Sequence, residues 1–107
     1  MTQKIVGTHV VGPREKLPAS KPWYNIPLTV KVPFPAAFTS KPIVIACTLQ
    51  DPKHTSAYPD TFAVTVISVT NTDFTVNICR TDYVGADYTT SGWGQNLQLS
   101  YIAEIPA

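Results

Sequence analysis

The sequence predicts a single small all-β domain, a six-stranded antiparallel β-sandwich, and two observations lead to this fold class. Ten prolines are spread from Pro13 to Pro106, and few intervals between them would admit a long helix. Apolar residues instead alternate with polar ones in short segments that are rich in Val, Ile, Thr, Phe and Tyr. Several such segments, separated by turn residues, are typical of a sandwich.

The expected strands are residues 3–11, 28–34, 43–49, 61–69, 74–78 and 97–105. In most of them every second residue is apolar, so one face of the strand is expected to be buried. Residues 43–49 are apolar on both faces, as expected for a central strand or for a strand covered by a partner subunit. In 61–69 the apolar phase shifts at Ile67, which indicates a β-bulge or a strand buried on both sides.

The connections between these strands contain residues that favour turns. Thr70-Asn71-Thr72-Asp73 predicts a hairpin, because Asn and Asp tolerate the conformations that tight turns need. Prolines on both sides of residues 36–40 indicate a kinked crossing between the two sheets. The longer loops are 12–24, 50–60 and 81–95, and function is expected there.

Length and composition favour one domain that associates with itself. A chain of 107 residues has room for one core, so 1–107 form one domain with an N-terminal strand or arm over about 1–12. Charged residues make up only 14% of the chain, which leaves a neutral surface rich in Thr, Ser and Asn. Such a surface tolerates being covered, so self-association is expected; the alternative is simply an uncharged polar surface.

Charge and hydropathy argue against two classes of partner. The net charge of +1 is too small for nucleic-acid binding, which needs clustered Lys and Arg. No apolar run approaches the roughly 20 residues needed to span a membrane, and the first residues lack the apolar stretch of a signal peptide. The protein is therefore expected in the cytoplasm as synthesised, either to be released or to become part of an assembled particle.

The two cysteines, Cys47 and Cys79, are expected to be free thiols. Alternation places Cys47 on the same face as Ile45, and it places Cys79 on the face opposite Val76. If both apolar sets face the core, the sulfur atoms point apart and cannot form a disulfide. Free thiols fit a reducing cytoplasm.

No pattern in the sequence predicts catalysis, a metal or a cofactor. His9 and His54 lie in different segments, and neither has the neighbouring His or Glu of a zinc motif. His9 is interpreted as a sheet residue and His54 as a loop residue of no special role. No sequence signal marks a nucleophile, and there is no glycine-rich phosphate loop. The chain is therefore not expected to be an enzyme.

Binding chemistry is better represented, above all in loop 81–95. This loop concentrates the aromatic residues Tyr83 and Trp93 close to Asp82. Sugars offer a weakly apolar face and a rim of hydroxyl groups, which suit an aromatic platform beside carboxylates. Two alternatives remain for Trp93, a lid on the end of the sandwich and a contact in a subunit interface. Trp23 and Tyr24 form a second aromatic pair, for which the alternative is a plug at the sandwich edge.

Several segments together resemble the H-type lectin domain of snail agglutinins and of the C-terminal domains of discoidins. Residues 34–45 (FPAAFTSKPIVI) match a strand that ends in Phe, an interval to Pro and an apolar strand. Residues 72–76 (TDFTV) match a turn followed by Gly-Phe and a strand, and 99–103 (LSYIA) match the final strand with its Ser-Trp-Ile-Ala. The resemblance covers roughly 24–105 and implies a sandwich that forms a homotrimer or a hexamer.

The resemblance also implies recognition of galactose or N-acetylgalactosamine in clefts between neighbouring subunits. The family builds its site from an acidic residue before the second strand, an Arg before the hairpin and a Trp-His pair after it. This sequence has Trp23 or Tyr24, the segment 60–61 and the segment 81–82 at those positions. The scaffold is thus similar, whereas the residues expected to contact sugar differ.

The sequence predicts an oligomeric, lectin-like protein that binds glycans or glycoconjugates without catalysis, with a role such as cell adhesion. The residues expected at the ligand are Trp23, Tyr24, Asp60, Asp82, Tyr83 and Trp93. The alternative is a structural or adhesion module for oligomerisation, such as the tip domain of a tail fibre or another appendage.

Overall fold

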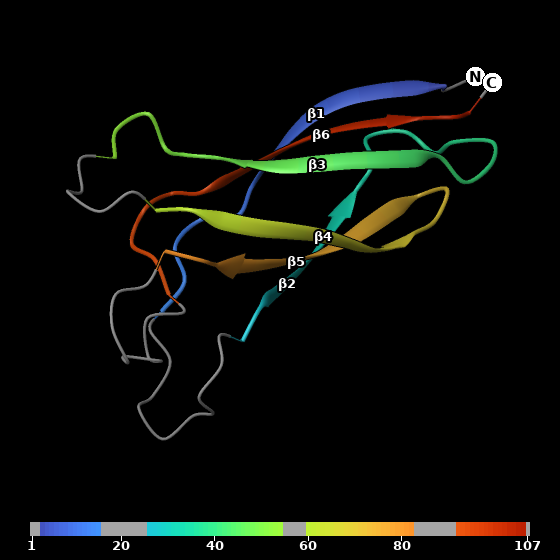
Figure 1. The fold of residues 1–107 in the computed structure, drawn as a ribbon. Coiled ribbons are helices and arrows are strands. Elements are labelled where there is room, and N and C mark those ends of the chain that lie inside the picture. The colour runs from blue at the N-terminus through green and yellow to red at the C-terminus, as the bar shows by residue number, and fades with distance from the viewer. Residues whose placement is uncertain (1–2, 16–25, 55–59, 83–91, 107) are drawn as a thin grey trace.

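The computed structural model describes residues 3–15, 26–54, 60–82 and 92–106, and it confirms the predicted sandwich. Two three-stranded antiparallel sheets pack against each other, one in the order β1-β6-β3 and the other in the order β2-β5-β4 (Figure 1). The strands are β1 (Lys4–Val10), β2 (Leu28–Pro33), β3 (Ile43–Leu49), β4 (Phe62–Val69), β5 (Asp73–Arg80) and β6 (Gln98–Glu104). Among the described residues, no helix is long and apolar enough to cross a membrane.

The hydrophobic core lies between the two central strands, β5 and β6. Each of these strands has a neighbour on both sides, and its inward side chains also face the opposite sheet. Phe74, Val76 and Ile78 of β5 and Leu99 and Ala103 of β6 are therefore completely buried. Full burial of an apolar side chain contributes about 1.5–3 kcal/mol, so these two strands supply much of the stabilisation.

A tight turn and a crossing close one end of the sandwich. The β4–β5 hairpin turns through Thr70–Asp73, where the Thr70 N–H donates to the Asp73 carbonyl at 2.9 Å. Beside it the chain crosses from β2 to β3, and Phe34 and Phe38 turn inward with their ring centroids 5.0 Å apart. Both the hairpin and the crossing between sheets agree with the sequence prediction.

Two details of individual strands also follow from the sequence. The register of β4 on β5 shifts between Val66 and Ser68, which confirms a bulge at Ile67. On β1, Gly7 allows the Tyr101 ring to pack directly on the backbone, because an added Cβ would lie 2.6 Å from that ring. After β1, Gly12 has a φ of 82°, a conformation that favours glycine.

One expectation for residues 43–49 is wrong. Strand β3 lies at the edge of its sheet and is not central. Ile43, Ile45 and Leu49 face outward and are exposed, whereas Val44 and Ala46 pack against the core. Alternation alone could not decide between the two faces, since both are apolar. The other expectation for this strand, that a partner subunit covers it, stays a prediction.

The cysteines are free, as expected, although the geometry differs from the expectation. Cys47 is exposed on the outward face of β3, and Cys79 lies on the outward side of β5, which belongs to the other sheet. The two sulfur atoms point apart because both residues face away from the core, not because Cys47 shares a buried face with Ile45.

Candidate binding site at the loop end of the sandwich

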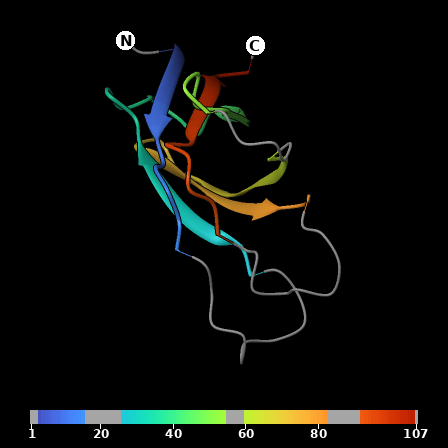
Figure 2. The ribbon, with the colours of Figure 1, turned by 90° about the vertical axis from the view of Figure 1, so that its left-hand side faces the viewer.

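The topology brings the three long connections to one end of the sandwich, which we call the loop end. Strands β1, β3 and β5 end there, and β2, β4 and β6 begin there (Figure 1). Figure 2 shows the molecule from the side that lies on the left in Figure 1, where β3 and β5 end and β4 begins. The described residues next to these strand ends, 11–15, 26–27, 50–54, 60–61, 81–82 and 92–97, therefore lie on the same side of the sheets.

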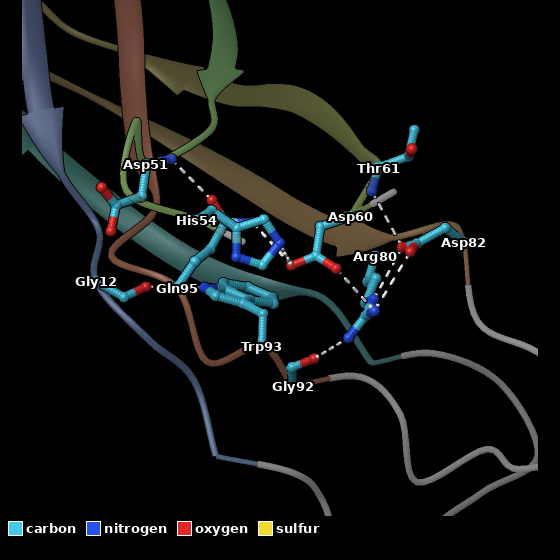
Figure 3. Close-up of polar contacts among 10 residues, drawn as sticks. All are labelled: Gly12, Asp51, His54, Asp60, Thr61, Arg80, Asp82, Gly92, Trp93 and Gln95. Carbon is cyan, nitrogen blue, oxygen red and sulfur yellow. Dashed lines mark hydrogen bonds and ion pairs between the residues drawn. The ribbon is translucent and has the colours of Figure 1, made fainter. Parts of the chain in front are cut away.

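Arg80, the last residue of β5, is the centre of a polar cluster at the loop end (Figure 3). Its Nε donates to Asp82 Oδ1 at 2.8 Å, and its Nη2 donates to Asp60 Oδ1 at 3.0 Å. Its Nη1 donates to the Gly92 carbonyl at 2.9 Å. One guanidinium group thus connects the segment before β4, the segment after β5 and the segment before β6.

Asp60 is held from a second side by Gln95. The Gln95 amide donates from Nε2 to Asp60 Oδ2 at 2.7 Å, and its Oε1 accepts the Asp51 N–H at 2.9 Å. His54 Nε2 lies 3.4 Å from the same Asp60 oxygen, although no hydrogen bond is formed there among the described residues. The side chain of Asp60 is only 5% exposed, so this carboxylate is buried and depends on its partners.

The charges of the cluster stabilise one another. Burial alone would raise the pKa of Asp82, but hydrogen bonds from Arg80 and from the Thr61 N–H, together with the positive charge of Arg80, lower it below its ordinary value. The hydrogen bond to Asp82 raises the pKa of Arg80. Both groups are therefore ionised over the physiological pH range, and the carboxylate oxygens act as fixed acceptors.

Trp93 lies next to this cluster as part of the core. Its ring is 4% exposed, and its indole N–H donates to the Gly12 carbonyl at 2.8 Å. The Trp93 and Phe62 ring centroids lie 5.0 Å apart in an edge-to-face arrangement, and the Arg14 guanidinium lies over the Trp93 ring, 5.9 Å from its centre. Trp93 thus occupies the position of a lid, the alternative that the sequence left open beside ligand contact.

The structure brings together two of the residues expected at the ligand, Asp60 and Asp82, through Arg80. Trp23, Tyr24 and Tyr83 lie outside the described residues. The described segments next to them nevertheless belong to the loop end, since Asp82 directly precedes Tyr83 in the chain.

Sequence reasoning missed three members of the cluster. Arg80 and Gln95 were not among the expected site residues, and His54 was interpreted as a loop residue of no special role. The signal that could have found Arg80 is an isolated cation at the end of a strand, two residues before Asp82 in a long loop. Gln95 offers no such signal, because its partners Asp51 and Asp60 are distant in sequence.

The cluster offers carboxylate, amide and guanidinium groups, but no metal site. No group of three or more His, Cys, Asp or Glu residues within the described segments could hold a metal ion. Compared with protein-family models, with curated proteins and with solved structures, the chain matches none of them.

Proposed function

We propose that this protein is a non-enzymatic, oligomeric lectin-like module that binds glycans of the galactose or N-acetylgalactosamine class at its loop end. The observation that carries the proposal is the position of Arg80 between Asp60 and Asp82. Carboxylates accept hydrogen bonds from sugar hydroxyl groups, and a planar guanidinium can donate two parallel bonds. Here all three groups lie at the base of the loops that carry the aromatic residues.

The resemblance to H-type lectins supports this position in space. It implies an Arg near residues 60–61 and a Trp-His pair near residues 81–82. These two segments are neighbours, since the Thr81 N–H donates to the Thr61 carbonyl at 2.8 Å. Arg80 therefore supplies a guanidinium group beside the position of the family's Arg. It does so from β5, the strand that pairs with β4.

Rigidity of the cluster also supports binding. The side chains of Arg80, Asp60, Asp82 and Gln95 are each fixed by at least one charge-assisted hydrogen bond, as in the contact of 2.8 Å between Arg80 and Asp82. A ligand that meets such groups loses little affinity to reordering of the protein. Single sugar sites are weak, and several copies on one oligomer raise the avidity by about 10²- to 10⁴-fold.

A glycan array tests the proposal, with two variants of similar chemistry. Asp82→Asn keeps the shape of the side chain and removes its charge at the loop end. Asp73→Asn makes the same change at the hairpin end, where the Asp73 carboxylate lies 3.5 Å from the exposed Lys31 and accepts hydrogen bonds from the hydroxyl groups of Thr70 and Thr72. We expect the wild type and Asp73→Asn to retain the same terminal sugar and Asp82→Asn to lose it. Circular dichroism of each variant shows that the fold is intact.

Equal retention by wild type and both variants would remove Asp82 from the site. No retention by the wild type on any glycan would favour the alternative, a structural or adhesion module. A specific observation supports that alternative: the side chain of Asp82 is 9% exposed and that of Asp60 is 5% exposed. Their hydrogen-bonding capacity is largely used within the protein, as in a cluster that only holds loops together.

A further inference from the structure

The outer face of the sheet β1-β6-β3 is an ordered array of exposed side chains. The antiparallel register aligns them in four rows of three across the strands. From the chain termini to the loop end, these are the charged row (Lys4, Glu104, Ile43), the bulky row (Val6, Ile102, Ile45), the small row (Thr8, Ser100, Cys47) and the loop-end row (Val10, Gln98, Leu49). In Figure 1 this face is the upper side of the upper layer.

The apolar members of this face are strongly exposed. Ile45 is 70% exposed and Val6 is 69% exposed, and Ile102 between them is 45% exposed although it lies on the central strand. A continuous apolar patch of this kind is uncommon on a monomer and marks a surface that another molecule covers. β-branched side chains in contact with water also make an unprotected sheet prone to nonspecific association.

The other sheet shows that such a face is not a general property of this chain. The outward side chains of β2-β5-β4 form rows such as Thr29, Asn77 and Thr65. Thr29 donates to Asn77 across the strands at 2.7 Å, so this face is polar and internally hydrogen-bonded. Of the two sheets in the described part of the chain, β1-β6-β3 therefore has the more apolar outer face, since the exposed apolar Ile67 of the other sheet stands alone at its bulge.

The shape of the apolar face has a raised and a hollow part. A hollow of about 420 Å³ lies over the small row and is bordered by the bulky row. A second hollow, of about 530 Å³, lies on the other side of the bulky row and is bordered by Ile43 and Glu104 of the charged row. The bulky row is thus a ridge between two depressions. A surface that has a hollow opposite this ridge, and a ridge opposite one of the depressions, would fit it.

We propose that this face binds the same face of a second copy of the chain, related by a two-fold axis that runs across the strands between the bulky and the small row. This operation places the bulky row of each copy over the small row of the other, where the hollow of 420 Å³ receives it. It also places the loop-end row over the charged row and its hollow of 530 Å³.

The charges of the face support this orientation. Lys4 and Glu104 are its only charged residues, and they pair in register at one end of the strands. The two-fold axis sets Glu104 opposite Gln98 of the partner subunit, whose amide can donate to the carboxylate. A parallel arrangement would instead bring Glu104 against the partner's Glu104 and the bulky row against itself. Like charges in contact cost free energy, and two ridges do not interlock.

The arrangement has a consequence that rests on the proposed function. Because the two copies run antiparallel, their loop ends point in opposite directions, and one dimer presents two glycan sites on opposite sides. Such a dimer would link two surfaces. It differs in this respect from the trimer that the family resemblance implies.

The mass in solution, measured by light scattering over a range of concentrations, tests the contact. Three strands of seven residues cover roughly 300 Å² of plane on each copy, or roughly 600 Å² in total, which is below the area of a standard interface and predicts a weak dimer. The measurement should therefore extend from about 1 to several hundred µM. We expect a monomer–dimer equilibrium for the wild type.

Two lysine variants locate the contact. Ile45→Lys puts an ammonium group into the centre of the proposed interface, and we expect the dissociation constant to rise by about a hundredfold or more. Thr65→Lys is the matched control on the outer face of the other sheet and should dimerise like the wild type. Both positions are exposed, so neither variant should affect the core. A dimer that survives Ile45→Lys, or equal weakening by Thr65→Lys, would overturn the proposal.

A third variant separates specific packing from mere stickiness. Ser100→Trp makes the face more apolar but fills the hollow that receives the bulky row, so we expect dimerisation to weaken. Stronger association of Ser100→Trp would contradict the packing. The thiol of Cys47 gives an independent readout in a Cys79→Ser background: labelling by a maleimide should slow as the concentration rises, and Ile45→Lys should abolish this protection.

Failure of the dimer and failure of the glycan site give different results. A wild type that remains monomeric at all concentrations overturns the dimer, and so does a trimer, because three copies cannot share one two-fold contact. Glycan retention by a monomeric wild type would support the glycan site and remove the oligomer from the proposed function. A dimer that Ile45→Lys dissociates, without retention of any glycan, would support the contact and remove the glycan site.

Discussion

The two ends of the sandwich are closed by different kinds of contact. At the hairpin end, Phe34, Phe38, Phe74 and Tyr101 pack against one another, with the Phe74 and Tyr101 ring centroids 4.9 Å apart. At the loop end, Arg80 connects buried carboxylates through hydrogen bonds of 2.8 and 3.0 Å. Aromatic packing tolerates a range of angles, whereas the polar cluster depends on the position of each donor and acceptor.

This difference bears on where the molecule can vary. The hairpin end is joined by short connections and by a turn whose hydrogen bonds are local, such as those from the backbone N–H groups of Thr72 and Asp73 to Thr70 Oγ1 at 3.1 Å. The loop end holds together segments far apart in sequence, such as Asp51 and Gln95. Binding residues are expected on the loop side, because long connections carry them more often than short turns do.

The largest effect is expected from breaking the aromatic end. Phe74 is completely buried between the rings of Phe34 and Tyr101, so Phe74→Ala removes a large side chain and leaves a cavity. We expect the free energy of unfolding in urea to fall by about 3–5 kcal/mol. Ile67→Ala, on the exposed bulge, is the control and should change it by less than about 0.5 kcal/mol. A loss below about 1 kcal/mol for Phe74→Ala would mean that this end does not carry the core.

The fold could be predicted because the residue pattern of most strands indicates which of their faces is buried. In β5 apolar and polar residues alternate throughout, and in β6 they alternate except at the exposed Ile102, so the sequence indicates both the strand and its inner face. In β3 it could not determine the face, since the outward residues Ile43 and Ile45 are more apolar than the inward Val44 and Ala46. Alternation alone does not distinguish apolar residues that pack in the core from apolar residues that another subunit would cover.

The polar cluster could be predicted only in part for a related reason. Asp60 and Asp82 were identified because charged residues stand out in long loops. Their common partner, Arg80, could be assigned only once the pairing of β4 with β5 sets it opposite Phe62. Gln95 contacts Asp51 and Asp60 through tertiary structure, and no local period encodes such a contact.

The next effect should come from breaking the loop end at its centre. Arg80→Met keeps much of the side-chain volume but leaves the buried carboxylates of Asp60 and Asp82 without their cation. We expect the free energy of unfolding to fall by about 3 kcal/mol, because an unpaired buried charge is costly. Lys31→Met breaks the exposed pair with Asp73 at the hairpin end and should cost at most about 1 kcal/mol. Equal losses would show that burial of the loop-end pair has no energetic consequence.

The smallest effect is expected from a change of pH, which acts on the charge of Asp82 at the loop end. Asp82 has a pKa below its ordinary value in the folded protein, so its ion pair stabilises the fold above the pKa of the unfolded chain. This contribution is lost as the pH falls through the lowered pKa of the folded state. At pH 7 we expect the free energy of unfolding of Asp82→Asn to be about 2 kcal/mol lower than that of the wild type.

Below the lowered pKa of Asp82, both proteins carry an uncharged side chain at this position, and their stabilities should converge. Urea unfolding at a series of pH values from 7 to about 2 measures this difference. Phe74→Ala serves as the reference from the other end of the sandwich, since its deficit involves no titrating group and should persist at low pH. If the Asp82→Asn deficit also stayed constant with pH, the loop end would be held by shape and packing, as the hairpin end is, and not by charge.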